Sequence, residues 1–153
     1  MNPAAEGFTN MLSEIRRKLA SGDAPAPPIG RLIGFRLLSA ENGEAVFELE
    51  ADERHWNPMG TVHGGVLCDI ADAAMGFAFA TTLAEGESFT TIELKINYLR
   101  PVWKARLRAT GRIVKRGRKI GLVDCDVTDE TGALVARASS TCLVLSGEDA
   151  RSR

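Results

Sequence analysis

The chain has 153 residues, of which 44% are hydrophobic and 25% are charged, and its formal net charge is −1. This length suits one domain with one hydrophobic core, and the composition is that of an ordinary globular protein. The near-neutral charge excludes a surface built to attract polyanions, so we expect no nucleic-acid partner.

The N-terminal part of the chain predicts a short helix and then a break. Apolar residues recur at helical spacing over residues 8–19, so we expect an amphipathic helix that packs on the domain edge. Residues 21–28 are rich in proline and alanine and are typical of a linker. The expected organisation is therefore an N-terminal helix and linker over 1–28, the main domain over 29–147 and a tail over 148–153.

The cysteines and the first twenty residues indicate a cellular setting. Charged side chains in that first segment exclude a signal peptide. The three cysteines are odd in number and dispersed, which argues against a disulfide framework and against a zinc site. We therefore expect a cytoplasmic protein without a metal.

A β-hairpin is expected next, with strands over 37–39 and 44–51. Asn42-Gly43 lies between them, and this dipeptide is a strong hairpin signal. The second strand alternates only roughly, and one of its faces is mostly polar. A polar loop over 52–58 leads into the central part of the chain.

Residues 66–83 predict a long buried helix. They are mostly aliphatic residues, Ala, Met and Phe, and no proline interrupts them. A helix that is apolar all round lies in a protein core or in a membrane. We favour a soluble core and expect no membrane partner, because Asp69 and Asp72 interrupt the run.

The rest of the chain predicts four strands, over 89–99, 105–115, 120–128 and 134–145. The first alternates cleanly between polar residues such as Thr91 and apolar residues such as Ile92, which is typical of a sheet with one buried face. A hairpin, a long helix and four strands together predict an α+β fold, in which one helix is buried against an antiparallel sheet.

Two features near the helix start point to chemistry. Gly64 and Gly65 precede the helix, where the first N–H groups lack intrahelical partners and the helix dipole is positive. Such an end can receive the negative charge that develops on a carbonyl oxygen under attack, although two ordinary turn glycines are the alternative. Asp72 stands among apolar residues, where an unpaired carboxylate is destabilising and its pKa rises. It either has a function, or it points to solvent or pairs with an arginine.

The spacing of these features constrains the site. Gly64 and Asp72 are eight residues apart, about 12 Å along a helix axis, so one small reacting group cannot touch both. If both serve one reaction, the second must come from another copy of the chain. We therefore expect a homodimer, because a two-fold interface supplies each site twice.

The pattern Asn57…Gly60…His63-Gly64-Gly65 followed by Asp72 resembles the signature of the hotdog-fold acyl-CoA thioesterases. It is most similar to the phenylacetate-degradation-like subfamily, which includes one type of 4-hydroxybenzoyl-CoA thioesterase. The resemblance extends over residues 29–145. It implies a curved antiparallel sheet wrapped around the central helix, and hydrolysis of an acyl-CoA to free acid and CoA. It also implies that coenzyme A is part of the substrate, with no separate cofactor, and that a homotetramer forms as a dimer of dimers.

The resemblance assigns roles to five residues. Asp72 acts as general base on water or as nucleophile, and the sequence leaves both open. The backbone N–H of Gly64 polarises the thioester carbonyl. Asn57 and His63 match positions that orient substrate or water and hold the loop, and Thr91 matches a Ser/Thr that holds the attacking water. An aromatic-CoA member of the family carries Glu at the acid position, so the acyl group stays open here.

Other residues compete with or extend this site. Asp69 is a second acid near the helix start, where the dipole favours a negative side chain without any catalytic role. Five basic residues are candidates for binding the phosphates of CoA, or for a solvated basic turn: Arg100, Lys115, Arg116, Arg118 and Lys119.

Two further functions are compatible with the sequence. One is a non-catalytic acyl-CoA-binding module, which would keep the pocket and the basic turn. The other is a hotdog dehydratase or hydratase acting on acyl thioesters, a related group with a catalytic His in a proline-containing loop. His55 and Pro58 are the residues that fit it.

Overall fold

A computed structural model describes Arg17 and residues 26–151. The helix expected over residues 8–19 lies, apart from Arg17, outside the described residues. One long helix, α3 (Gly64–Ala80), crosses one face of a six-stranded sheet. The other helices within residues 26–151 are short: α2 (Pro28–Ile33), a 3-10 turn (Glu53–His55) and α4 (Glu148–Arg151). The strands are β1 (Phe35–Glu41), β2 (Glu44–Ala51), β3 (Ser88–Tyr98), β4 (Ala105–Arg116), β5 (Ile120–Thr128) and β6 (Leu134–Leu145).

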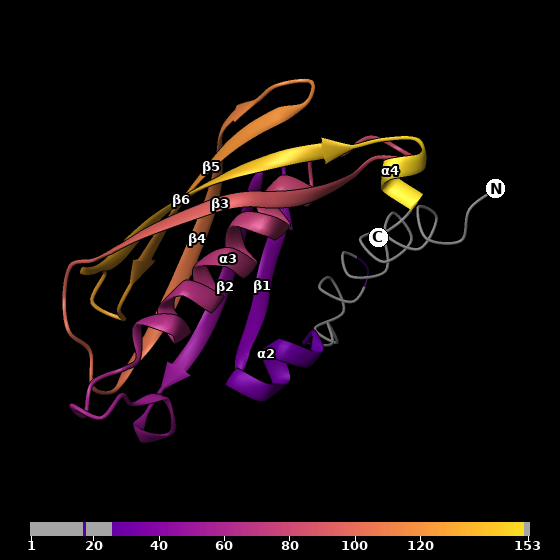
Figure 1. The fold of residues 1–153 in the computed structure, drawn as a ribbon. Coiled ribbons are helices and arrows are strands. Elements are labelled where there is room, and N and C mark those ends of the chain that lie inside the picture. Colours follow the sequence, from indigo (N-terminus) through magenta and orange to yellow (C-terminus); the bar gives the residue numbers. More distant parts are fainter. Residues whose placement is uncertain (1–16, 18–25, 152–153) are drawn as a thin grey trace.

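The strands form a single antiparallel sheet in the order β1-β2-β4-β5-β6-β3. Figure 1 shows the sheet curving around α3, with β3 and β6 on one side of the helix and β1 and β2 on the other. The inner face of the sheet and one side of α3 make a continuous apolar core. The α+β fold with one central helix is therefore confirmed.

Most of the predicted elements are present, with small differences at their ends. β5 and β6 have the predicted bounds, whereas β1 begins at Phe35, two residues before the prediction. α3 ends at Ala80 rather than at residue 83, because the hydroxyls of Thr81 and Thr82 donate to the carbonyls of Ala78 and Phe79 and terminate the helix. Helix α2 and the 3-10 turn were not predicted. No helix within residues 26–151 is both long enough and apolar enough to cross a bilayer.

Strand β3 differs from its predicted alternation. The register against β6 shifts between Thr91 and Glu93, so Ile92 is an extra residue. Ile92 is 57% exposed, contrary to the prediction, and Thr91 lies opposite the buried Cys142. The bulge therefore turns Thr91 toward the helix side of the sheet, where the expected site lies.

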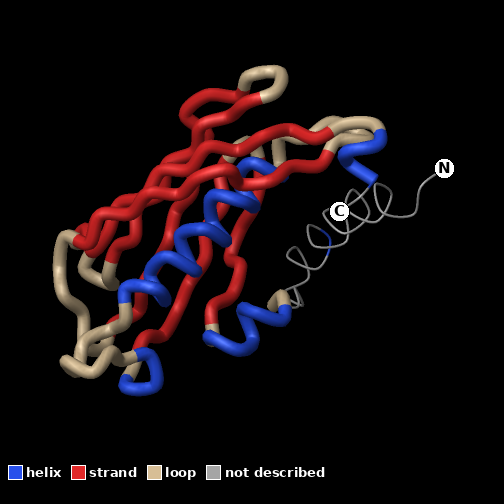
Figure 2. The backbone as a smooth tube through the Cα atoms, in the orientation of Figure 1, coloured by secondary structure: helices blue, strands red, loops and turns tan. Residues whose placement is uncertain are grey.

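Figure 2 shows that the two ends of α3 meet different loops. The loop after β2 and the connection from β3 to β4 lie near its first residues, since the Val62 N–H donates to the Val102 carbonyl at 2.7 Å. The β4–β5 hairpin lies near its last residues, where Arg116 contacts Phe79 and Thr82. The Gly64 end of α3 and the β4–β5 hairpin therefore lie at opposite ends of the helix, and Asp72 lies midway between them.

Candidate active site

The first turn of α3 presents a free backbone donor. His63 is the N-cap residue, and its Nδ1 accepts a hydrogen bond from the Gly65 N–H at 2.9 Å. The Gly64 N–H has no acceptor among the described residues. Of the two glycine donors, only that of Gly64 is thus available to an incoming oxygen.

Asn57 organises the loop that delivers this helix end. Its Oδ1 accepts from the N–H groups of Met59 at 2.9 Å and Thr61 at 3.3 Å, and its Nδ2 donates to the Thr61 hydroxyl at 2.9 Å. The N–H of His63 donates to the His55 carbonyl at 2.8 Å. Asn57 and His63 therefore both hold the loop, and their orientation of substrate or water remains a prediction.

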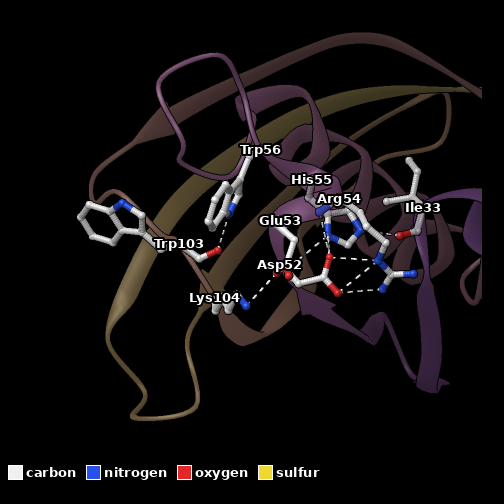
Figure 3. Close-up of polar contacts among 8 residues, drawn as sticks. All are labelled: Ile33, Asp52, Glu53, Arg54, His55, Trp56, Trp103 and Lys104. Carbon is white, nitrogen blue, oxygen red and sulfur yellow. Dashed lines mark hydrogen bonds and ion pairs between the residues drawn. The ribbon is translucent and has the colours of Figure 1, made fainter.

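Figure 3 shows a second histidine, His55, inside a polar cluster beside this loop. The ring is buried, its Nδ1 accepts from the Asp52 N–H at 3.1 Å, and its Nε2 donates to the Ile33 carbonyl at 2.7 Å. Arg54 pairs with Asp52 and, through hydrogen bonds to its side chain, lowers the pKa of that carboxyl to about 2. Both ring nitrogens of His55 are thus engaged in the fold, which disfavours the dehydratase role.

Asp72 lies on a side of α3 that the sheet does not cover. The residues at this side follow helical spacing and are exposed or half-buried: Asp69, Asp72, Ala73 and Gly76. We call these four residues the open stripe. In the single chain Asp72 is exposed, because an apolar helix packs its sheet-facing side and leaves this stripe uncovered. Its burial against a second copy of the chain remains a prediction.

The pKa values of both acids of the open stripe are raised. Surrounding protein atoms raise the pKa of Asp72 although the side chain reaches solvent, and the negative charge of Asp69 raises it further. Partial burial likewise raises the pKa of Asp69, while the positive charge of a protonated His63 lowers it. Asp72 is thus the acid whose proton affinity is raised by both effects, as suits a group that exchanges protons.

Thr91 of β3 and Asp72 of α3 both act on the thiol of Cys142 in β6. Burial raises the pKa of the Cys142 thiol, hydrogen bonds from Ser140 and Thr91 lower it, and the charge of Asp72 raises it. The Cys142 side chain is therefore near both residues. The Thr91 hydroxyl contacts this thiol, and its role in holding a water remains a prediction.

The five basic residues do not lie together. Arg100 faces Asp129 at 3.5 Å, and its backbone N–H bonds Val135, far from the β4–β5 hairpin. Arg116 is folded inward, since it pairs with Glu87 at 2.9 Å and lies 5.2 Å from the centre of the Phe79 ring. The other three are exposed at the hairpin and form no ion pair with the described residues: Lys115, Arg118 and Lys119.

Two other features of the molecule are weaker candidates for a site. A cleft of about 430 Å³ between β2 and β4 contains none of the predicted site residues. Its lining charges are largely paired within the chain, as in the contact of Arg106 with Glu50 at 2.6 Å. Within the described residues, no three His, Cys, Asp or Glu side chains are arranged to hold a metal ion.

Sequence reasoning missed one residue at the helix end. The Tyr98 hydroxyl donates to the Gly64 carbonyl at 3.0 Å, although the two residues are 34 positions apart. Tyr98 is the last residue of β3. Its spacing from Gly64 carries no signal, because the contact depends on how β3 crosses the helix.

Comparisons with known proteins agree with this geometry. The sequence profile of the thioesterase superfamily matches residues 59–136, which include Gly64, Asp72 and Thr91. The 1,4-dihydroxy-2-naphthoyl-CoA hydrolase of Listeria monocytogenes is 30% identical over 112 residues, 73% of this chain and 91% of that protein.

Two solved structures share the fold at 30% identity. A variant of the phenylacetic acid degradation protein PaaI from Thermus thermophilus has a TM-score of 0.71 and covers 76% of this chain and 98% of its own. The smu.793 protein from Streptococcus mutans, bound to acetyl CoA, has a TM-score of 0.67; the match covers 73% of this chain and 89% of that protein. The expected hotdog fold is confirmed, and the chain belongs to the thioesterase superfamily as a thioester hydrolase.

Proposed function

We propose that this chain hydrolyses an acyl-CoA thioester to a free acid and CoA, with Asp72 of one subunit and the Gly64 N–H of its partner acting on one thioester. The proposal rests on one observation: a helix end with a free N–H and a carboxylate on the open stripe belong to the same helix. A CoA ester as substrate is supported by a relative named as a CoA hydrolase and by a neighbour with acetyl CoA bound.

The chemistry needs one base or nucleophile and one oxyanion donor. As general base, ionised Asp72 takes a proton from water while the water oxygen attacks the thioester carbon. As nucleophile, its carboxylate attacks that carbon and forms an anhydride, which water then cleaves. In both routes the carbonyl oxygen becomes negative toward the Gly64 N–H, and the CoA sulfur leaves as a thiolate that gains a proton.

A dimer with antiparallel α3 helices brings the two groups together. Within one helix they are about 12 Å apart along the axis, whereas two helices packed through the open stripe can place Gly64 of each opposite Asp72 of the other. Ala73 and Gly76 are small enough to let a second helix approach. β3 is the last strand of the sheet, and its outer edge can pair with a second copy. We therefore propose a homodimer as the active unit, with a dimer of dimers as the larger assembly.

The same arrangement gives the basic hairpin a role. An antiparallel pair brings the C-terminal end of one α3 toward the N-terminal end of its partner. Lys115, Arg118 and Lys119 would then flank the partner's Gly64 and bind the phosphates of CoA. Arg116 is left out, because its guanidinium is already held by Glu87.

The proposal is tested by hydrolysis of a panel of aromatic and straight-chain acyl-CoA esters, followed as release of free thiol. Asp72→Asn should abolish turnover without loss of stability, because the pKa of Asp72 is raised in the folded chain. Asp69→Asn is the matched control, since it removes the same charge from the same stripe and should retain turnover. Full activity of Asp72→Asn would overturn the assignment, and ligand binding without thiol release by the wild-type chain would identify a binding module.

The cross-subunit geometry has its own test. Gly64→Pro removes the N–H at the first helical position, where the φ of proline is accepted, and its ring displaces the Tyr98 side chain that lies against this glycine. Asp72→Asn removes the carboxylate. Each variant alone should be inactive. Mixed and re-equilibrated in equal amounts, they form heterodimers with one intact site, so about a quarter of wild-type activity should return. No recovery from two folded, exchanging variants would place the reaction within one chain.

A further inference from the structure

The peptide group between Gly64 and Gly65 is held on both sides by side chains. Its carbonyl accepts from the Tyr98 hydroxyl at 3.0 Å, and its N–H donates to His63 Nδ1 at 2.9 Å. The two partners come from different elements, since Tyr98 ends β3 and His63 ends the loop before α3. The neighbouring N–H of Gly64 has no acceptor among the described residues.

The ring of Tyr98 also fills the space beside Gly64. A Cβ atom built on Gly64 would lie 2.8 Å from Tyr98 Cζ and 3.0 Å from its hydroxyl oxygen. The ring therefore lies against the bare Cα of the glycine, and no other residue fits there without displacing it. Tyr98 is 53% exposed as a whole, so this contact is not a consequence of deep burial in the core.

Two consecutive glycines at a helix end would otherwise be loosely held, because glycine accesses more backbone conformations than any other residue. An oxyanion donor stabilises a transition state only if it is already aimed where the charge develops. The hydroxyl and ring of Tyr98 restrain the peptide that follows the Gly64 N–H.

We propose that Tyr98 is a positioning residue for thioester hydrolysis, whose hydrogen bond to the Gly64 carbonyl aims the Gly64 N–H at the substrate. This inference rests on the proposed function, in which that N–H polarises the thioester carbonyl. Tyr98 acts through the peptide backbone and has no bond to the reacting atoms.

The hydroxyl stays a donor at neutral pH. Partial burial raises the pKa of Tyr98 above its ordinary value of 10.0, and a negative charge on Cys68 would raise it further. Because Tyr98 is the only tyrosine of the chain, biosynthetic incorporation of a fluorinated tyrosine alters this one position. Fluorination lowers the phenol pKa, so the labelled hydroxyl loses its proton at alkaline pH.

The experiment compares full-length wild type, Tyr98→Phe and the fluorotyrosine-labelled protein on one hydrolysed acyl-CoA. Tyr98→Phe keeps the ring and loses the hydrogen bond, so kcat should fall about three- to tenfold with KM unchanged. Thr90→Val removes a hydroxyl from the same strand and should leave kcat unchanged. The kcat of the labelled protein should fall at alkaline pH, where its phenol loses the proton, whereas the kcat of the wild type should not fall at the same pH.

Each result decides the matter. Wild-type kcat in Tyr98→Phe, a raised KM alone, or a labelled protein with the wild-type pH profile would overturn the positioning role. If Tyr98→Phe fails to fold, the labelled protein carries the test alone. A wild type inactive on every CoA ester would overturn the proposed function and this inference together, and so is distinct from a failure of Tyr98 only.

Discussion

Gly111 lets strand β4 touch the backbone of α3, and Gly111→Ala should be strongly destabilising. A Cβ at this position would lie 2.5 Å from the Ala74 carbonyl oxygen and 2.8 Å from the Met75 nitrogen. Ordinary contacts of a Cβ begin at 3.4 Å, so the helix backbone must retreat by about 0.9 Å. Overpacking costs about 1–3 kcal/mol when side chains adjust. Here the obstruction is helix backbone, so we expect about 3 kcal/mol.

The assay is urea unfolding followed by circular dichroism, at one protein concentration because association adds to stability. Gly76→Ala is the matched control, since it adds the same methyl group where the nearest atom, in the Phe89 ring, lies 3.6 Å away. Alanine is favoured over glycine in a helix by about 1 kcal/mol, which offsets any weakening of the proposed helix pairing, so this variant should lose far less stability than Gly111→Ala. A loss below about 0.5 kcal/mol in Gly111→Ala would refute the direct strand–helix contact.

Other outcomes follow from the site and the residues around it. Asp69→Asn should move the acid limb of kcat/KM to lower pH, because the Asp69 charge raises the pKa of Asp72. Since the folded state raises that pKa, ionised Asp72 destabilises the fold as pH rises from its ordinary value of 3.8. Asp72→Asn should therefore unfold at a higher urea concentration than wild type at pH 7, with a smaller difference in acid. Arg116→Ala should lower the free energy of unfolding by about 1–3 kcal/mol and leave KM unchanged. Arg118→Ala should raise KM about two- to fivefold at low salt and leave the free energy of unfolding unchanged. His55→Ala leaves two backbone groups without partners and should lower the free energy of unfolding by about 2–3 kcal/mol.

Local turn chemistry explains why several elements were predictable. β5 and β6 have the predicted ends because the turn between them is encoded in four residues. Asp129 Oδ1 accepts from the N–H groups of Thr131 and Ala133, and Gly132 has a φ of +82° that suits glycine. The turn before α3 was predictable for the same reason, since His63 and the glycines after it act within one turn, although the helix begins at Gly64 and not at residue 66.

Features that depend on distant partners were not predictable. The bulge at Ile92 reverses the alternation of half a strand, yet a bulge leaves no mark in a binary pattern. The sequence left the exposure of Asp72 open, because the apolar composition of a helix does not say which of its sides another element covers. The contact between Tyr98 and Gly64 joins two segments whose proximity is set by the sheet order.

Helix α3 has its closely packed side and its proposed catalytic side on different faces. On the sheet-facing side, the backbone of α3 lies directly against Gly111 of β4, with no room for an added methyl group. This contact fixes the position of the helix relative to the sheet. The residues of the open stripe are exposed or half-buried. The raised pKa of Asp72 means that the fold disfavours its ionised form, which a general base requires. A group that weakens the fold when charged can be kept only where neighbouring contacts supply the stability. The close packing of one side therefore permits the proposed catalytic acid on the other.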